Sequence, residues 1–396
     1  MSKIIKIDWV NRSHFFTQGE MSYLYNFLKT STSLTQGNEL LKFETSLKKY
    51  LKIQNINVVS SAAAGLEIIA LLLQLKKGDE IIIPAHTYCA TALPFLRNGA
   101  KIVWADIDFK TRVISLEDIK KKITKKTKAI ILVHLYGYAV DVFKIKNYLK
   151  NKKIKIIEDC AQAFGAEVKG KKVGTIGDFA CYSFHAQKNF TTLGEGGAIY
   201  VKNSKLFKNV KGIRHNGHTN YKKRKSYWYP AMGNLDLDIK EALPFKATLS
   251  EIQCAAGYLS LKRIDKLNNI RISRAKQFID AFKKYKILSF NDSFNKKRHV
   301  YHLLSAYVDP KFNLDRNLLF EELFTRYKIK CATQYYPLYR YPLFKKLGAG
   351  TGRCPNTEKF YDNMISFPFH VWMKKKDFTY MIESIKKILD KHIKKN

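Results

Sequence analysis

The sequence lacks long apolar runs without charge. No stretch of eighteen or more uncharged apolar residues occurs among the 396 residues, so we expect no membrane-spanning helix. The longest apolar stretch, residues 66–75, contains Glu67 and is typical of a buried helix. Residues 1–8 also lack the apolar segment of a secretory signal peptide.

Closely spaced cysteine pairs are absent as well. Six cysteines are scattered along the chain without a CxxC motif: Cys89, Cys160, Cys181, Cys254, Cys331 and Cys354. This spacing indicates neither a zinc site nor a disulfide framework. We therefore expect no metal and a reducing, cytoplasmic location.

Acidic residues are scarce. The chain has 33 Asp and Glu against 71 Lys and Arg, which gives a formal net charge of +38. A nucleic-acid-binding protein would gather its basic residues on one element with interleaved aromatics. Here lysine covers nearly every polar face, for example residues 120–128, 144–155 and 386–395. We expect no nucleic-acid partner, although the charge would attract small anions.

The first half of the chain instead contains a regular alternation of short β-branched runs and amphipathic segments. Such alternation predicts an α/β layer with a mostly parallel sheet. In such a sheet, ligands bind at the carboxyl ends of the strands. The predicted strands are residues 56–61, 80–83, 101–105, 129–133, 154–157, 179–184 and 198–201, and the predicted helices are 62–76, 116–123 and 142–150.

Residues 214–245 break this alternation. They are rich in Tyr, Trp, Asn, Lys and Gly and show no period, which is typical of a functional or mobile loop. Ser250 and Gln253 then form a capping-box pattern, and the helix that begins there is predicted to run through Leu261 and Ile264 toward Phe278. We place a domain boundary along it.

The boundary gives a large domain of residues 1–255, including an N-terminal arm, and a smaller C-terminal α/β domain of residues 256–396. The smaller domain closes on an amphipathic helix. The apolar face of this helix is predicted to consist of Phe378, Met381, Ile382, Ile385, Ile388 and Leu389.

Residues that could bind a ligand or take part in catalysis follow several of the strands. Asp159 and Gln162 come directly after one strand, where the carboxylate could cap a helix or hold a protonated ring nitrogen of a cofactor. Lys188 follows another strand, but a lysine alone says little in so lysine-rich a chain. The small residues 61–65 open a helix and suit either an anion at its first amides or close packing on the sheet.

Together these segments resemble the sugar aminotransferases of the DegT/DnrJ/EryC1/StrS type, a branch of the fold-type I enzymes that use pyridoxal 5'-phosphate (PLP). The resemblance extends from about Leu34 to Leu389. It implies an α/β fold like that of aspartate aminotransferase, with a seven-stranded large domain, a small C-terminal domain and a homodimer with active sites at its interface. The matching stretches are VSSAAAGLE, KKGDEIIIPAHTYCATA, GAKIVWADID, KTKAIILVHLYGYAVD, IIEDCAQAFGA, GTIGDFACYSFHAQKNFTTLGEGG and SEIQCAAGYLSLKRID.

The resemblance also implies roles for individual residues. Lys188 matches the lysine that holds PLP as a Schiff base, and Asp159 matches the residue that pairs with the ring nitrogen. Gln162 matches a residue beside the ring, and Tyr88 an aromatic that stacks on it. The remaining predicted cofactor contacts are Ser183 and the amides of Ala62 and Ala63 at the phosphate, His185 in the same loop as Ser183, and Lys246. Lys188 argues against the subgroup in which a histidine replaces the lysine and sugars are dehydrated.

Three positions depart from the family pattern. Ala62-Ala63 stand where relatives usually have Gly-Thr or Ala-Thr after the serine of the first loop. Lys246 and Thr248 lie where many relatives have an asparagine that reaches the cofactor phosphate of the neighbouring subunit. In the segment from Gln334 to Tyr339, both histidines of the family's HYxPLH-like pattern are replaced, which points to a different acceptor pocket.

The function that this resemblance implies is a transaminase that uses glutamate as donor and a nucleotide-linked keto-sugar as acceptor, in cell-surface polysaccharide or amino-sugar biosynthesis. An alternative acceptor is a keto-cyclitol or another free ketone. An alternative of a different class is a non-catalytic protein on this fold that binds nucleotides or polyanions. The basic and aromatic loop from Arg214 to Lys246, which includes Lys222 to Lys225, could hold the diphosphate of a sugar nucleotide or could be a solvated surface loop.

Overall fold

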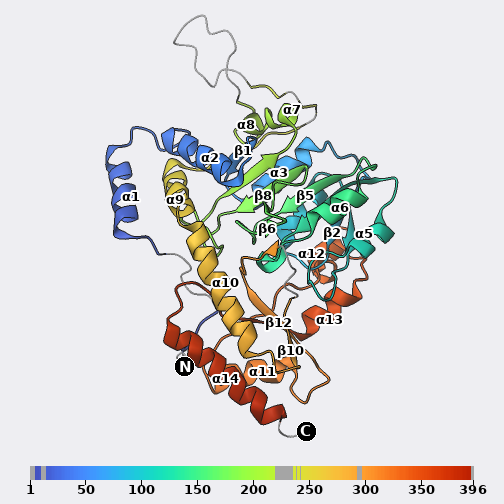
Figure 1. Cartoon of the computed structure of the whole chain (residues 1–396). Helices are drawn as coiled ribbons and strands as arrows, with labels where there is room; N and C mark the ends of the chain where they lie inside the picture. Colours follow the sequence, from blue (N-terminus) through green and yellow to red (C-terminus); the bar gives the residue numbers. More distant parts are fainter. Residues whose placement is uncertain are drawn as a thin grey trace, which may run out of the picture.

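The computed structural model describes residues 5–9, 15–218, 235–237, 239–240, 242–291 and 297–393. A seven-stranded sheet forms its larger part (Figure 1). Strand β9 is antiparallel to both of its neighbours, and the other adjacent strands are parallel, which confirms the predicted mostly parallel sheet. In spatial order the strands are β1 (Ile56–Val59), β9 (Gly197–Val201), β8 (Phe179–Ser183), β5 (Lys155–Asp159), β4 (Thr127–Val133), β2 (Glu80–Pro84) and β3 (Lys101–Ala105).

Both faces of this sheet are buried in apolar cores. In β8, Phe179 and Cys181 belong to one core cluster, while Ala180 and Tyr182 belong to another. Because neighbouring side chains of a strand point to opposite faces, the two clusters cover the two sides of the sheet. This explains why the strands are continuously apolar rather than alternating.

Helices from the intervening segments cover the sheet. They are α2 (Asn38–Leu51), α3 (Ala62–Leu72), α4 (Leu93–Arg97), α5 (Leu116–Lys122) and α6 (Val142–Tyr148). The helix predicted over residues 62–76 ends earlier, at Leu72. Gln74 adopts a left-handed φ of 48°, and the carboxylate of Asp79 accepts a hydrogen bond from the amide of Lys76 at 2.9 Å, so a turn replaces the last helical residues.

A second core lies around the antiparallel sheet of β10 (Leu288–Ser289), β12 (Leu304–Val308) and β13 (Met364–Phe367). Helices α11 (Arg316–Thr325) and α14 (Lys375–Ile393) pack around this core. All six apolar residues predicted for the last helix are buried, which confirms its amphipathic pattern.

The two parts of the chain are connected through α9 (Glu251–Leu261) and α10 (Ile264–Ala281), which extend from the large sheet to the C-terminal one (Figure 1). The capping box of Ser250 and Gln253 is confirmed. The single predicted helix is broken, however, because Arg263 leaves the helical conformation at φ −114° and ψ 1°. The predicted domain boundary at 255/256 falls within α9 and stays a prediction.

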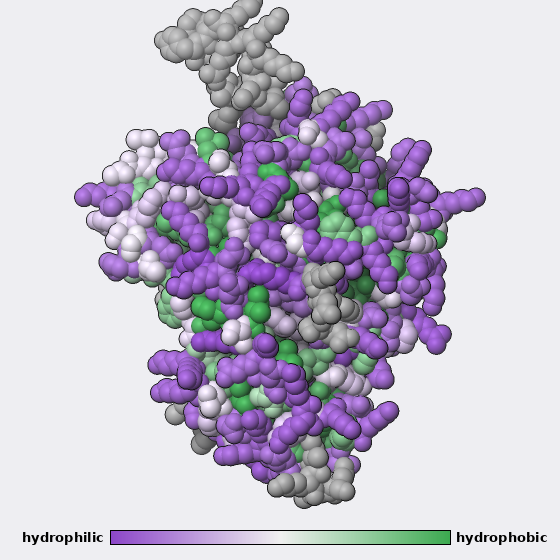
Figure 2. Space-filling view, in the orientation of Figure 1, coloured by the Kyte–Doolittle hydropathy of each residue, from purple (hydrophilic) through white to green (hydrophobic). Residues whose placement is uncertain are grey.

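Shorter elements complete the described chain, and hydrophilic residues cover most of the face shown in Figure 2. Among the described residues, no helix is both long and apolar enough to cross a membrane. The remaining elements are α1 (Gln18–Thr30), α7 (Ser204–Phe207), α8 (Val210–Ile213), α12 (Pro342–Lys346), α13 (Pro355–Asn363), the single-turn helices η1 (Cys89–Thr91), η2 (Leu135–Gly137) and η3 (Leu338–Arg340), and a small sheet of β6 (Glu167–Val168), β7 (Lys171–Lys172) and β11 (Lys297–Arg298).

The buried face of α14 gives a test of the C-terminal core. We expect Ile385→Ala to lower the free energy of unfolding by about 2–5 kcal/mol, because Ile385 is fully buried and its loss leaves a cavity. The exposed Lys387 on the same helix is the control, and Lys387→Ala should change the free energy by less than about 0.5 kcal/mol. Denaturant unfolding measures both values. Equal effects would contradict the assignment of this face.

Candidate active site

A cavity of about 560 Å³ lies at the carboxyl ends of β5 and β8, beside the start of α3. This is the edge at which ligands bind in parallel sheets, and the volume is typical of a small-molecule site. Eight of the nine predicted site residues line it: Ala62, Ala63, Tyr88, Asp159, Gln162, Ser183, His185 and Lys188. The fold therefore gathers residues that lie up to 126 positions apart (from Ala62 to Lys188) around one space.

Asp159 ends β5 with its carboxylate held in place. Its Oδ1 accepts a hydrogen bond from the amide of Ala161 at 3.0 Å, and its Oδ2 accepts one from the hydroxyl of Thr91 at 2.9 Å. Residues 160–165 form turns and no helix, so Asp159 does not cap a helix. It is a buried carboxylate fixed at the cavity wall.

Lys188 lies in the turn that follows β8, where its backbone amide donates a hydrogen bond to the carbonyl of His185 at 2.9 Å. Its side chain is partly exposed to the cavity. Burial lowers the pKa of the Lys188 amine, and the negative charge of Asp159 acts in the opposite direction. A lowered pKa increases the fraction of neutral amine, which is the form that attacks a carbonyl carbon.

Gln162 is held at both ends of its amide. Its oxygen accepts a hydrogen bond from the amide of Tyr136 at 2.8 Å, and its nitrogen donates to the hydroxyl of Tyr335 at 2.9 Å. Tyr335 and Thr91 line the cavity and were not among the predicted site residues. Thr91 belongs to the stretch ending in HTYCATA, which matches the family pattern. Tyr335 belongs to the segment after Gln334, which departs from that pattern. The comparison with the family pattern therefore marks both segments.

Another part of the cavity wall suits an anion. Ser61 caps α3 by accepting a hydrogen bond from the amide of Ala64 at 3.0 Å, and the amides of Ala62 and Ala63 precede the first intrahelical hydrogen bond. The hydroxyl of Ser183 lies at the same edge. A Cβ atom at Gly197 would meet the backbone of Ser61 and Ala62 at 2.5 and 2.6 Å, so only glycine lets β9 approach this turn.

The other predicted residues lie at or beyond the cavity rim. Tyr88 is 58% exposed, and its ring meets that of Tyr335 edge-on at 6.2 Å. The ring nitrogen Nε2 of His185 lies 3.6 Å from a carboxylate oxygen of Glu195. Lys246 is exposed and does not line the cavity of its own chain, so its predicted contact with a neighbouring subunit stays a prediction. The basic loop residues 222–225 lie outside the described residues.

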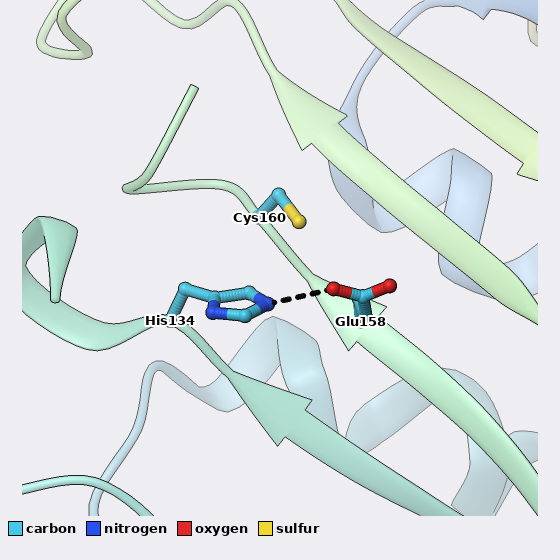
Figure 3. Close-up of side chains that lie close together, drawn as sticks. All are labelled: His134, Glu158 and Cys160. Atoms are coloured by element: carbon cyan, nitrogen blue, oxygen red, sulfur yellow. Dashed lines mark hydrogen bonds and ion pairs between the residues drawn. The ribbon is translucent and has the colours of Figure 1, made fainter. Parts of the chain in front are cut away.

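A buried cluster of His134, Glu158 and Cys160 adjoins the site and has the residue types of a metal centre (Figure 3). Its donor atoms are already occupied. Glu158 accepts hydrogen bonds from the amides of Gly174 at 2.8 Å, Ile176 at 2.9 Å and Gly177 at 2.6 Å, and Nε2 of His134 lies 3.1 Å from its carboxylate.

Nδ1 of His134 accepts a hydrogen bond from the amide of Val140 at 3.0 Å, which leaves Nε2 to carry the hydrogen. Burial raises the pKa of the Cys160 thiol well above its ordinary value, so the thiol stays protonated. Although burial alone would raise the pKa of Glu158, the hydrogen bonds from His134 and the loop amides hold it below its ordinary value. We therefore assign this cluster a structural role.

The cavity fits PLP, the cofactor implied by the sequence resemblance. A cofactor of this kind needs an amine that attacks an aldehyde, a carboxylate for a protonated ring nitrogen, and donors for a phosphate. Lys188, Asp159 and the first-turn amides of α3 supply these three groups around one space. Asp159 therefore places a fixed negative charge in the same cavity as the amine of Lys188.

Comparison with known proteins gives the same assignment. The family model described as the DegT/DnrJ/EryC1/StrS aminotransferase family matches residues 17–386. A UDP-4-amino-4,6-dideoxy-N-acetyl-beta-L-altrosamine transaminase of Campylobacter jejuni is 31% identical over 379 residues, which covers 94% of this chain and 96% of the relative.

Two solved structures share the fold over nearly their whole length. The first is Helicobacter pylori PseC, an aminotransferase involved in the biosynthesis of pseudoaminic acid. It superposes with a TM-score of 0.86 at 26% identity, over 97% of this chain and 99% of that one. Spr1654 of Streptococcus pneumoniae, solved in its PLP form, superposes with a TM-score of 0.83 at 27% identity, over 96% and 99% of the two chains.

Lys188 lines the cavity, and burial lowers the pKa of its amine. We expect borohydride reduction of the PLP-loaded protein, followed by peptide mapping, to find the pyridoxyl group on Lys188. Burial also lowers the pKa of Lys146, but Lys146 donates to the carbonyl of Ile176 and does not line the cavity, so it serves as the internal control. Lys188→Ala should lose the label and the activity. Labelling of Lys146 at the same level would contradict the assignment.

Proposed function

Because the chain belongs to the DegT/DnrJ/EryC1/StrS aminotransferase family and is a PLP-dependent aminotransferase, we propose that its amino acceptor is the ketone of a nucleotide-linked sugar. The proposed donor is glutamate, so the products are an amino sugar nucleotide and 2-oxoglutarate. The amino sugar would serve cell-surface polysaccharide or other amino-sugar biosynthesis. Membership of an enzyme family removes support for a non-catalytic polyanion-binding protein.

The observation that carries the proposal is the cavity of about 560 Å³ beside Lys188. A site of this volume accommodates a sugar next to a cofactor, and the +38 net charge of the chain attracts a diphosphate. The relative from Campylobacter jejuni, which is similar over nearly the whole chain, is named for a UDP-linked amino sugar. Similarity over nearly the whole length of both chains supports the same class of acceptor here.

When bound, PLP supplies a carbonyl carbon that exchanges amines and a conjugated ring that takes up electrons. We assign to the amine of Lys188 the covalent attachment of the cofactor and the transfer of a proton at the substrate carbon that carries the nitrogen. A lowered pKa suits both tasks, because the amine must be neutral to attack and to accept the proton.

Asp159 would keep the ring nitrogen of PLP protonated. Its hydrogen bonds from Thr91 and Ala161 fix the carboxylate, so no reorganisation is needed when charge develops in the ring. Gln162, held by Tyr136 and Tyr335, would flank the ring, and Tyr88 would stack on it. Ser183, His185 and the amides of Ala62 and Ala63 would hold the phosphate, with Lys246 contributed by the neighbouring subunit.

A homodimer is part of the proposal. None of the 13 described residues of α1 is buried, although Met21, Tyr25 and Leu28 are large and apolar. Leu34 and Leu41 add exposed apolar surface nearby in the chain. Apolar patches of this kind are typical of surfaces that a second copy covers. We also propose a cytoplasmic location, because all six cysteines are free thiols.

The charge of Asp159 can be tested by Asp159→Asn, which keeps the shape of the side chain. We expect kcat to fall about 10²- to 10³-fold, because the ring nitrogen loses its anionic partner. Thr91 would keep the amide in place, so the melting temperature should change little. Glu195→Gln removes a carboxylate from the same cavity and is the matched control. A kcat for Asp159→Asn close to that of the wild type would contradict the assigned role.

The acceptor class is tested with the purified PLP-loaded enzyme and glutamate as donor. We expect 2-oxoglutarate to form with a UDP- or GDP-linked 4-keto-6-deoxy sugar, with a kcat/KM at least about 100-fold above that for a free keto-cyclitol, because the diphosphate adds charged contacts. Raising the salt concentration should increase KM for the sugar nucleotide and leave KM for the free ketone unchanged. A preference for the keto-cyclitol would overturn the proposal.

A further inference from the structure

A second, smaller cavity also borders Lys188. Its volume is about 90 Å³, and Gln187, Lys188, Gln334 and Tyr335 line both this cavity and the larger one. The side chains that belong to the smaller cavity alone include Arg271 from α10, His302 and His370. One water needs about 10–15 Å³ of such space, so the cavity has room for a carboxylate with its neighbouring carbon.

Arg271 is the main charged group of this cavity. It is 3% exposed, and its Nη1 donates a hydrogen bond to the carbonyl oxygen of Tyr301 at 3.3 Å. Burial lowers the pKa of Arg271 to about 10, and the positive charge of Arg274 acts in the same direction. Among the described residues, no carboxylate forms an ion pair with Arg271. A buried guanidinium without an anionic partner is costly, and a bound carboxylate would offset that cost.

The two histidines of the cavity add no charge of their own. Burial lowers the pKa of His302 well below its ordinary value, with the charges of Lys188 and Arg271 acting in the same direction. Burial likewise lowers the pKa of His370 to about 4. Both rings are therefore neutral near pH 7, and Nδ1 of His370 is a buried nitrogen without a hydrogen-bond partner in the described structure. The cavity is polar and cationic through Arg271.

Arg274, one turn further along α10, shows how an arginine with a structural task is used here. Its Nη1 donates to the carbonyls of His370 at 2.9 Å and Val371 at 2.8 Å, and so fixes the segment that carries His370. Arg271 makes a single longer bond and keeps most of its five donors for another group. Arg274 therefore supports the backbone at the cavity wall, whereas the guanidinium of Arg271 is available to bind a ligand inside the cavity.

We propose that Arg271 binds the α-carboxylate of the amino-acid donor, in the small cavity beside Lys188. In an α-amino acid, the carboxylate is bonded to the carbon that carries the amine. An amine placed at Lys188 therefore brings the carboxylate into the neighbouring space that Lys188 and Arg271 share. A planar carboxylate matches the fork of a guanidinium, and the burial of Arg271 strengthens the pair. The inference rests on the amino-acid donor of the proposed function and not on the identity of the acceptor.

The test uses the PLP-loaded enzyme and α-methyl-L-glutamate, a donor analogue without the α-hydrogen that transamination removes. We expect Arg271→Gln to raise the Kd of this analogue, measured by calorimetry, roughly 100-fold, and Arg271→Lys to raise it roughly tenfold, because lysine keeps the charge and loses the fork. Arg112→Gln is the matched control. Arg112 is also a buried arginine with a pKa of about 10, but it lines neither cavity, so the Kd should change less than about threefold.

A second measurement identifies the carboxylate. In the wild type, single-turnover conversion of the cofactor by L-isoglutamine, which lacks the α-carboxylate, should be far weaker than conversion by L-glutamate. In Arg271→Lys this difference should shrink at least about tenfold. An unchanged Kd in both Arg271 variants overturns the inference. So does a variant effect that disappears with L-glutamine, which keeps the α-carboxylate but lacks the side-chain carboxylate of L-glutamate. Since no sugar is present, a wrong acceptor leaves this test intact, and a wild type that reacts with no amino acid contradicts the proposed function instead.

Discussion

Two opposing influences meet at the amine of Lys188. Burial lowers its pKa, and the negative charge of Asp159 raises it. The ordinary pKa of lysine lies far above neutrality, so an unperturbed amine would be almost wholly protonated. The burial and the neighbouring charge that act on Lys188 must therefore be supplied by the fold. The parallel order of β5 and β8 satisfies this requirement, since it brings the ends of the two strands to one edge of the sheet and there encloses a cavity. The two core clusters hold that edge rigid from both faces.

The residue before Asp159 explains why the carboxylate stays fixed. Because side chains alternate along a strand, Glu158 lies on the opposite side of β5 from Asp159. Three loop amides hold Glu158 there, and its contact with His134 is drawn in Figure 3. A buried charge without such partners would destabilise the strand end by several kcal/mol. Because adjacent residues of a strand share one backbone, anchoring Glu158 also restricts the direction of Asp159. The cluster resembles a metal site in its composition, but its hydrogen bonds serve the position of the neighbouring carboxylate.

Much of this arrangement could be predicted from the sequence, and the misses have physical reasons. Strands such as 101–105 have strong β-branched patterns, and local motifs such as the capping box at Ser250 depend only on near neighbours. The early end of α3 depends on a turn closed by Asp79, and Tyr335 reaches the cavity through a hydrogen bond to Gln162, 173 positions away. Arg271 shows the same limit, because nothing in the helical pattern of α10 distinguishes it from Arg274.

Helix α1 has a consequence for assembly. Helix α1 has 13 residues and none of them is buried. It is attached to the rest of the chain by polar contacts, such as Tyr23 with Glu39 and Glu20 with Arg263, and a helix this short is marginal in water on its own. In the homodimer that we propose, part of the association free energy would therefore be spent on ordering this segment. Folding and association would then be coupled, so that the melting temperature would rise with protein concentration and dilution would release α1 before the sheet unfolds.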